Sequence, residues 1–161
     1  MEYLISTDPT KLDLDLIHQF LSEHSYWARG IPREVVVRSI ANSLCFGVYA
    51  SGKTNPDSDW RQVGFARVAT DRATFAYLAD VFILPEHRGR GLSKRLMEEI
   101  VAHPDLQGLR RWMLATADAH GLYRAYGFTE LSQPDSFMQR HNPDVYKSNG
   151  PSEWPQQKDP A

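Results

Sequence analysis

Two glycines that alternate with arginines form the segment of this sequence best suited to bind an anion. The segment Arg88-Gly89-Arg90-Gly91-Leu92-Ser93 lies between an apolar run that ends at Pro85 and an amphipathic pattern that begins near Gly89. Glycine has no side chain, so its backbone N–H groups can approach a phosphate closely, and a helix start adds partial positive charge. The sequence therefore predicts an anion-binding turn between a strand and a helix.

A second glycine-containing segment, residues 47–54, matches the G-x-x-x-x-G-K-T pattern of nucleotide hydrolases. That pattern binds phosphate only where a strand ends at the first glycine and a helix begins at the lysine. Here Val48 and Tyr49 continue a strand-like run, and Asn55-Pro56-Asp57 is typical of a turn. We therefore interpret the segment as a hairpin loop.

Length and composition indicate one soluble globular domain of 161 residues, of which 42% are hydrophobic and 24% charged. A net charge of −2 gives no overall attraction to nucleic acid or to an anionic membrane. No apolar run approaches the roughly 18 residues that span a bilayer, and residues 1–5 lack the features of a signal peptide. The single cysteine, Cys45, excludes an internal disulfide and indicates a buried thiol in a cytoplasmic protein.

Apolar periodicity predicts an α+β fold. Expected strands cover residues 3–5, 44–50, 62–69, 74–84 and 111–116, and a final hairpin would pair 128–131 with 137–140. Helices are expected from Asp8-Pro9, from Pro32, after the glycine turn, and over 118–126 with Gly127 as its C-terminal cap. These elements predict a central mixed, mainly antiparallel sheet flanked by helices on both faces. We assign residues 1–141 to this domain and 142–161 to a polar, proline-containing tail in which Trp154 could be an anchor.

The glycine turn and a later segment together resemble the GCN-related N-acetyltransferase (GNAT) superfamily, in a branch of small proteins. Arg88, Gly91 and Ser93 occupy the family's Arg/Gln-x-x-Gly-x-Gly/Ala positions, with Ser93 in place of the usual glycine or alanine. Residues 122–128, Leu-Tyr-Arg-Ala-Tyr-Gly-Phe, resemble the family's Leu-Tyr-x-x-x-Gly-Phe segment. They follow the turn after one strand and one short helix, as in the family, and the resemblance covers about residues 44–131.

The resemblance implies an acetyltransferase that uses acetyl-CoA as cosubstrate. No His/Cys cluster in the sequence suggests a metal. The CoA pyrophosphate would be bound by backbone amides of the turn, namely Arg88, Gly89, Arg90, Gly91, Leu92 and Ser93. The pantetheine arm would lie along the preceding strand, at Val81, Phe82 and Ile83. A strand N–H near Phe82 or Ile83 could also support the oxyanion on the thioester carbon.

Acetyl transfer to an amine needs a proton acceptor and a proton donor. A lysine-like amine with a pKa of about 10.4 is neutral in roughly one molecule in a thousand at pH 7. Tyr123 occupies the position of the family's tyrosine and is the expected general acid for the CoA thiolate. Asp80, on the strand expected to carry the thioester, could act as the base or bind the amine, and His120 is a further candidate.

The acceptor pocket of this family is formed by the first helices and their loop, here Tyr26, Trp27 and Arg29, with His120 near it. Aromatic walls could hold an apolar or cationic substrate and Arg29 a carboxylate, although the aromatics could instead cover the edge of the core. We predict N-acetylation of a primary amine on a small-molecule or amino-acid-like acceptor, and leave a homodimer open. A protein or peptide amine acetyltransferase and a noncatalytic acyl-CoA-binding module are the alternatives.

Overall fold

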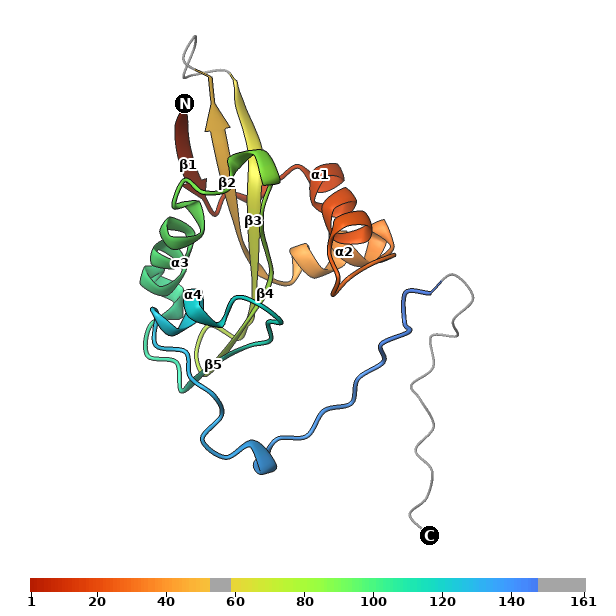
Figure 1. Ribbon diagram of the computed structural model, residues 1–161, viewed down its shortest axis with the longest axis vertical. Coiled ribbons are helices and arrows are strands. Elements are labelled where there is room, and N and C mark those ends of the chain that lie inside the picture. The colour runs from red at the N-terminus through yellow and green to blue at the C-terminus, as the bar shows by residue number, and fades with distance from the viewer. Residues whose placement is uncertain (53–58, 148–161) are drawn as a thin grey trace.

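One mixed sheet organises the fold (Figure 1). The computed structural model of the chain describes residues 1–52 and 59–147. Within these ranges five strands follow one another in the order β1 (Glu2–Ser6), β2 (Leu44–Ser51), β3 (Trp60–Thr70), β4 (Phe75–Ile83) and β5 (Arg111–Leu114). The first four are antiparallel neighbours, whereas β4 and β5 run parallel. The predicted mixed, mainly antiparallel sheet is confirmed.

Helices cover both faces of the sheet, as predicted. On one face lie α1 (Leu14–Gln19), the π-helical turn η2 (Phe20–His24) that continues it, and α2 (Arg33–Ala41). On the other lie α3 (Leu92–Ala102) and the short α4 (His120–Arg124). The apolar stripe of α3 is fully buried against the sheet and consists of Leu92, Leu96, Met97 and Ile100.

Two helices, α1 and α3, begin later in the structure than the sequence predicts. The helix expected at Asp8-Pro9 is a short 3-10 turn (Pro9–Lys11), because the Asp8 side chain accepts the N–H of Thr10 and closes the turn there. The α-helix begins only at Leu14, after Asp13 caps it. α3 likewise begins at Leu92 rather than near Gly89, since Gly89 and Gly91 both have left-handed φ values.

The predicted final hairpin is wrong. None of the described residues 125–147 lies in a strand, and a 3-10 turn (Pro134–Ser136) interrupts this part of the chain. A strand needs a neighbouring strand to bond its backbone groups. Here the Phe137 ring instead packs against Arg111, whose guanidinium carbon lies 4.6 Å from the centroid of the ring. Residues 132–147, here called the arm, then run away from the sheet (Figure 1).

The segment that matches the nucleotide-hydrolase pattern begins inside a strand. β2 continues through Gly47 to Ser51, which pairs with Trp60 of β3. A phosphate loop would require the strand to end at Gly47. Lys53, Thr54 and the predicted turn at 55–57 lie outside the described residues, as does Trp154. In the described ranges, none of the helices combines the length and the apolar character needed to cross a membrane.

Candidate active site

The site is built around the point where β4 and β5 separate. Their pairing ends with Leu78 opposite Leu114, while β4 continues to Ile83. Residues 79–83 of β4 therefore keep β3 as a neighbour on one side and have no strand partner on the other. This leaves a free strand edge that leads directly into the glycine turn.

A bulge in β4 lies at the same place. Phe82 pairs with Phe65 and Ala79 with Arg67, so two residues of β4 stand opposite one residue of β3. One of the two is Asp80, whose φ of 56° is left-handed. Aspartate tolerates this conformation better than most residues. The bulge turns the Asp80 carboxylate toward the face covered by α1 and α2.

The glycine turn forms an open cradle at the start of α3. A cavity of about 290 Å³ is lined by Ile83, His87, Arg88, Gly89, Gly91, Leu92, Ser93, Lys94 and Leu122. No side chain caps α3, and no atom lies within 4 Å of where a Cβ would stand on Gly89 or Gly91. The first-turn N–H groups of a helix have no intrahelical partner, so this cradle suits an anion.

Six of the predicted cofactor residues thus line one cavity: Ile83, Arg88, Gly89, Gly91, Leu92 and Ser93. Val81 and Phe82 lie earlier on β4, with Phe82 stacked on Phe20, and Arg90 is exposed on the turn. The Arg88 side chain donates from Nε to the Ile83 carbonyl at 2.9 Å and so braces the turn. Sequence reasoning missed His87, which shares a hydrogen bond of 3.1 Å with the Tyr3 hydroxyl, and also Lys94 and Leu122.

Asp80 is held by donors from two other elements. Its Oδ2 accepts the Arg67 Nε–H at 2.7 Å, and its Oδ1 accepts the Trp27 indole N–H at 2.9 Å. Arg67 in turn donates to Ser43 Oγ at 3.2 Å. Only 11% of the Asp80 side chain is exposed. The two bonds pair the carboxylate with the Arg67 cation and hold it in one orientation. The sequence prediction missed Arg67, whose only signal was an arginine within an apolar strand.

Tyr123 on α4 faces the loop that carries Tyr26. Its side chain is buried, and this burial raises its pKa above the ordinary value, with smaller contributions from Tyr26 and Asp118. Tyr26 crosses from the first helices to the β5–α4 loop, where its hydroxyl accepts the Ala117 N–H at 3.0 Å. The Trp27 ring packs edge-on against Tyr26, with centroids 5.0 Å apart.

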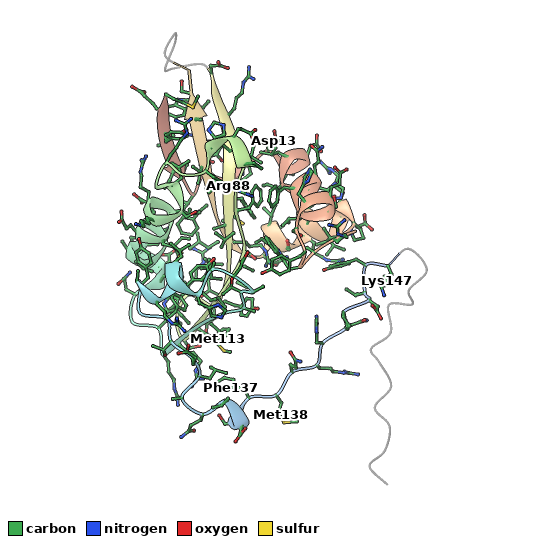
Figure 2. The ribbon with its side chains drawn as sticks, viewed as in Figure 1. Asp13, Arg88, Met113, Phe137, Met138 and Lys147 are labelled. Atoms are coloured by element: carbon green, nitrogen blue, oxygen red, sulfur yellow. The ribbon has the colours of Figure 1, made fainter. Side chains whose placement is uncertain are left out.

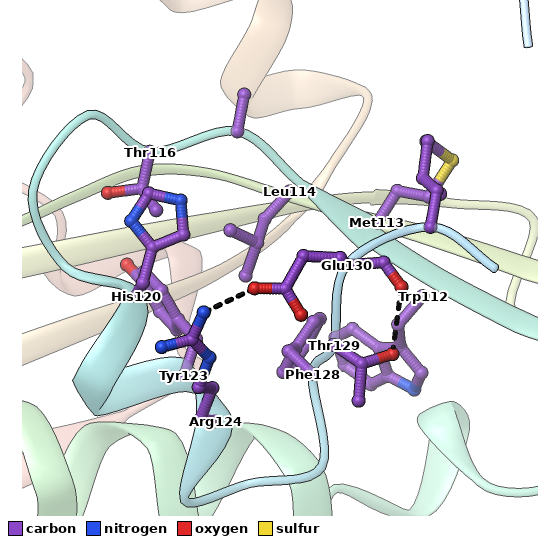
Figure 3. A pocket seen from close by; sticks show the side chains of 12 residues that line it. Trp112, Met113, Leu114, Thr116, His120, Tyr123, Arg124, Phe128, Thr129 and Glu130 are labelled. Atoms are coloured by element: carbon purple, nitrogen blue, oxygen red, sulfur yellow. Dashed lines mark hydrogen bonds and ion pairs between the residues drawn. The ribbon is translucent and has the colours of Figure 1, made fainter. Parts of the chain in front are cut away.

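Four predicted residues are therefore connected by contacts or charge: Tyr26, Trp27, Asp80 and Tyr123. Arg29 is exposed on the same loop. His120 lines a second cavity of about 320 Å³ beside β5, which Tyr123 also lines, together with Arg124 and Glu130, which form an ion pair (Figure 3). Figure 3 shows that the His120 ring stands at the end of this cavity nearest Thr116.

Comparison with known proteins decides the family. The family model described as an acetyltransferase (GNAT) domain matches residues 57–130. A Gibberella zeae protein assigned as an acetyltransferase is 37% identical over 136 residues, which cover 76% of each chain. The chain belongs to the GNAT acetyltransferase family.

Solved structures of relatives share the fold of this acetyltransferase. A GNAT-family protein from Xanthomonas campestris pv. campestris, assigned as an acetyltransferase, is 55% identical with a TM-score of 0.85 and covers 92% of this chain and 99% of its own. A Clostridium acetobutylicum protein, crystallised with acetyl-CoA, is 16% identical with a TM-score of 0.56, covering 82% and 92%. At that identity the second likeness concerns the fold alone. The family uses acetyl-CoA, and the uncapped α3 start beside two open glycines fits its phosphates.

Proposed function

We propose that this acetyltransferase moves the acetyl group of acetyl-CoA to a primary amine of a small-molecule or amino-acid-like acceptor, by direct attack with Tyr123 as general acid. The observation that carries the proposal is the buried Tyr123 phenol, which lines the cavity beside β5 and whose pKa is raised by burial and, to a smaller extent, by Tyr26. A phenol is protonated at neutral pH, so Tyr123 is in the form that a general acid needs.

The glycine turn and the free β4 edge would position the cosubstrate. Amides of residues 88–93 would bind the CoA phosphates, and Val81, Phe82 and Ile83 would offer backbone groups to the pantetheine arm. The Clostridium acetobutylicum neighbour, crystallised with acetyl-CoA, supports acetyl-CoA as the cosubstrate. When bound, acetyl-CoA supplies the activated acetyl group.

Asp80 and the two aromatic residues would hold the acceptor. Each Asp80 oxygen keeps a second lone pair beyond the bond to Arg67 or Trp27, and these can accept a hydrogen bond from the amine. As the C–N bond forms and the C–S bond breaks, the amine proton passes to Asp80 directly or through water. Tyr123 donates its proton to the departing sulfur. Tyr26 and Trp27 would form the aromatic wall of the acceptor pocket. We also propose that the protein works in the cytosol, a reducing compartment in which the buried, free Cys45 stays a thiol.

The test is thiol release from acetyl-CoA with a panel of small amines, amino acids and peptides. We expect Tyr123→Phe to lower kcat by about 10²- to 10⁴-fold with little change in the KM for acetyl-CoA. Tyr126→Phe is the matched control, since its hydroxyl donates to the Lys94 carbonyl of α3 at 3.0 Å and has no assigned role in proton transfer. Equal kcat values for Tyr123→Phe and wild type would remove Tyr123 as the acid.

Other outcomes of the same panel separate the alternatives. Turnover restricted to peptide amines would assign the protein to peptide or protein N-acetylation. Binding of CoA with no turnover on any amine would favour a noncatalytic acyl-CoA-binding module.

A further inference from the structure

The far end of the arm returns to the side of the sheet where the first helices lie. Residues 142–147 form a compact turn, in which the Val145 N–H donates to the Asn142 carbonyl and the Lys147 N–H to the Asp144 carbonyl. The Lys147 ammonium also pairs with the Asp144 carboxylate at 2.7 Å. Figure 2 shows Lys147 on the same side of the sheet as α1 and α2. The arm therefore places a folded turn close to these helices.

Tyr146 joins this turn to the loop after the first helices. Its carbonyl lies so close to Gly30 that a Cβ added there would stand 2.9 Å from the oxygen. Gly30 also has a left-handed φ of 79°, and its N–H donates to the Ser22 carbonyl at 2.9 Å. Both the backbone conformation and the close approach favour glycine at this position. The contact therefore holds Tyr146 next to the loop that carries Tyr26 and Trp27.

The Tyr146 side chain lies near the ion pair of Asp80 and Arg67. It packs against the apolar cluster between α1, α2 and the sheet, and this cluster includes Cys45, which stands opposite Arg67 in the β2–β3 register. Burial raises the pKa of Tyr146, the charge of Asp80 raises it further, and the guanidinium of Arg67 lowers it. The packing and the two charges agree on one place for the phenol, which is close to the Asp80 carboxylate.

Aromatic side chains of the loop stand at the same carboxylate. Trp27 binds Asp80 through its indole N–H, yet 42% of Trp27 and 60% of Tyr26 remain exposed. The Asp80 side chain beside them is almost buried. Exposed aromatic rings around a carboxylate form a surface that suits an organic ammonium ion, because both the charge and the ring faces attract it.

We propose that Tyr146 is a specificity-determining residue of the acceptor site. Its ring and that of Trp27 enclose the Asp80 carboxylate, and the space between them limits the bulk of the amine that reaches it, so that the acceptor is a compact primary amine. This inference rests on the proposed function, because it takes Asp80 as the group that binds the amine. Tyr146 lies outside residues 57–130, which the family model matches, so it supplies a property of this chain rather than of the whole family.

A residue that limits the size of the acceptor differs from a purely structural one in what its loss changes. Removing a wall admits bulkier amines and so changes the ratio of kcat/KM between two acceptors, for which one methylene group is worth about 10- to 200-fold. Removing a structural contact lowers kcat/KM for all acceptors by a common factor. In the first case the KM for acetyl-CoA stays the same, since the CoA phosphates bind at the glycine turn.

Thiol release with two amines of similar basicity, propylamine and cyclohexylmethylamine, measures this ratio. In Tyr146→Ala we expect kcat/KM for cyclohexylmethylamine relative to propylamine to rise about tenfold or more, with an unchanged KM for acetyl-CoA. Tyr146→Phe keeps the ring and should keep the wild-type ratio, as should the control Val145→Ala at an exposed position of the same turn. Tyr146→Val takes the place of the alanine variant if circular dichroism shows that the latter is unfolded. An unchanged ratio, or an equal loss with both amines, would overturn the proposal.

Binding of the same two amines tests the inference without turnover. In the nitrogen-15-labelled chain saturated with CoA, the NMR signal of the Trp27 indole N–H reports on the acceptor side, and its loss in Trp27→Phe identifies it. Propylamine is expected to shift this signal in wild type and in Tyr146→Ala, whereas cyclohexylmethylamine should shift it only in the variant. The same response of both proteins to cyclohexylmethylamine, or no response to either amine, contradicts the inference. A wild type that binds propylamine in this way but releases no thiol removes the proposed function and leaves the role of Tyr146 in place.

Discussion

Trp27 donates its indole N–H to Asp80 Oδ1 at 2.9 Å, although the two residues are 53 positions apart in the sequence. The bond ties the loop after the first helices to the bulge of β4. Because Arg67 occupies the other oxygen of the same carboxylate, the loop, the bulge and β3 share one anchor. A change at any of the three is therefore expected to move the side of the site where we propose that the acceptor binds.

Trp27→Phe should disturb the acceptor side without damaging the fold. It keeps an aromatic ring and removes one hydrogen bond to a carboxylate, a type worth about 1.5–3 kcal/mol when buried. Since Trp27 is partly exposed, we expect a loss of only about 1 kcal/mol in urea unfolding, together with a several-fold higher KM for the amine. Trp60→Phe at the start of β3 is the control. An unchanged amine KM for Trp27→Phe would show that this loop does not shape the acceptor pocket.

Arg67→Met should lower the free energy of unfolding more than Trp27→Phe does, because it leaves the Asp80 carboxylate without its cation. Removing one partner of a buried ion pair costs about 3–5 kcal/mol, and the slight exposure of this pair lowers our expectation to about 2–3 kcal/mol. Urea unfolding followed by circular dichroism measures the loss.

The double variant Arg67→Met/Asp80→Asn should recover part of this stability. Asparagine tolerates the left-handed φ of position 80 and carries no charge. A double variant no more stable than Arg67→Met would mean that an unbalanced charge is not the cause.

The features that the sequence predicts correctly depend on interactions between residues that are close together in the sequence. The turn at residues 88–93 follows from local glycine conformations, and the buried face of α3 from the spacing of Leu92, Leu96 and Ile100. The contacts of Asp80 could not be predicted in this way. They depend on the β3–β4 register, in which one bulge places Arg67 opposite Ala79, and on a loop that returns Trp27 to the sheet.

The failed hairpin has the same kind of cause. Residues 128–131 and 137–140 have strand-like composition, but a strand forms only where another strand accepts its backbone bonds. Within the described chain this segment contributes a wall of the β5 cavity and a ring on Arg111 instead. Local pattern could not reveal that no strand of the described chain lies beside this segment.

Gly91→Ala should weaken anion binding at the glycine turn, because it strains the backbone there without adding a steric clash. Gly91 has a φ of 75°, which costs a non-glycine residue roughly 1–2 kcal/mol, while the space around its Cβ position is open. We expect about 1 kcal/mol of lost stability and several-fold weaker CoA binding by calorimetry. Gly121→Ala, in α4 with equally open space, should instead stabilise by about 0.5–1 kcal/mol. Equal effects of the two changes would contradict the assigned role of Gly91.

Cys45 should react with thiol reagents only after unfolding. Its side chain is buried, and this burial raises its pKa to about 12, so almost no thiolate exists at neutral pH. Ellman's reagent at pH 8 is expected to label the native protein at the rate of local opening and the urea-unfolded protein at once. Thr10→Cys, at an exposed position, provides the fast-reacting reference. Rapid labelling of native wild type would show that Cys45 is accessible.

Tyr49 should make the protein sensitive to alkaline pH. Its hydroxyl is buried without a hydrogen-bond partner in the described part of the chain, and burial, with a smaller effect of Asp8, raises its pKa to about 12. A group whose pKa is raised on folding stabilises fully below its unfolded pKa of about 10 and loses that contribution as pH rises toward 12. The loss is at most about 1.4 kcal/mol per pH unit.

Tyr49→Phe isolates this contribution from that of the other tyrosines. At pH 7 the variant should be as stable as wild type or more stable by about 1 kcal/mol, because it removes a buried hydroxyl that forms no bond. Between pH 10 and 12 its stability should fall less steeply than that of wild type in urea titrations. A Tyr49→Phe variant that is less stable at pH 7 would mean that the hydroxyl does form a hydrogen bond in solution. Parallel alkaline slopes would mean instead that Tyr49 ionises as readily in the folded chain as in the unfolded one.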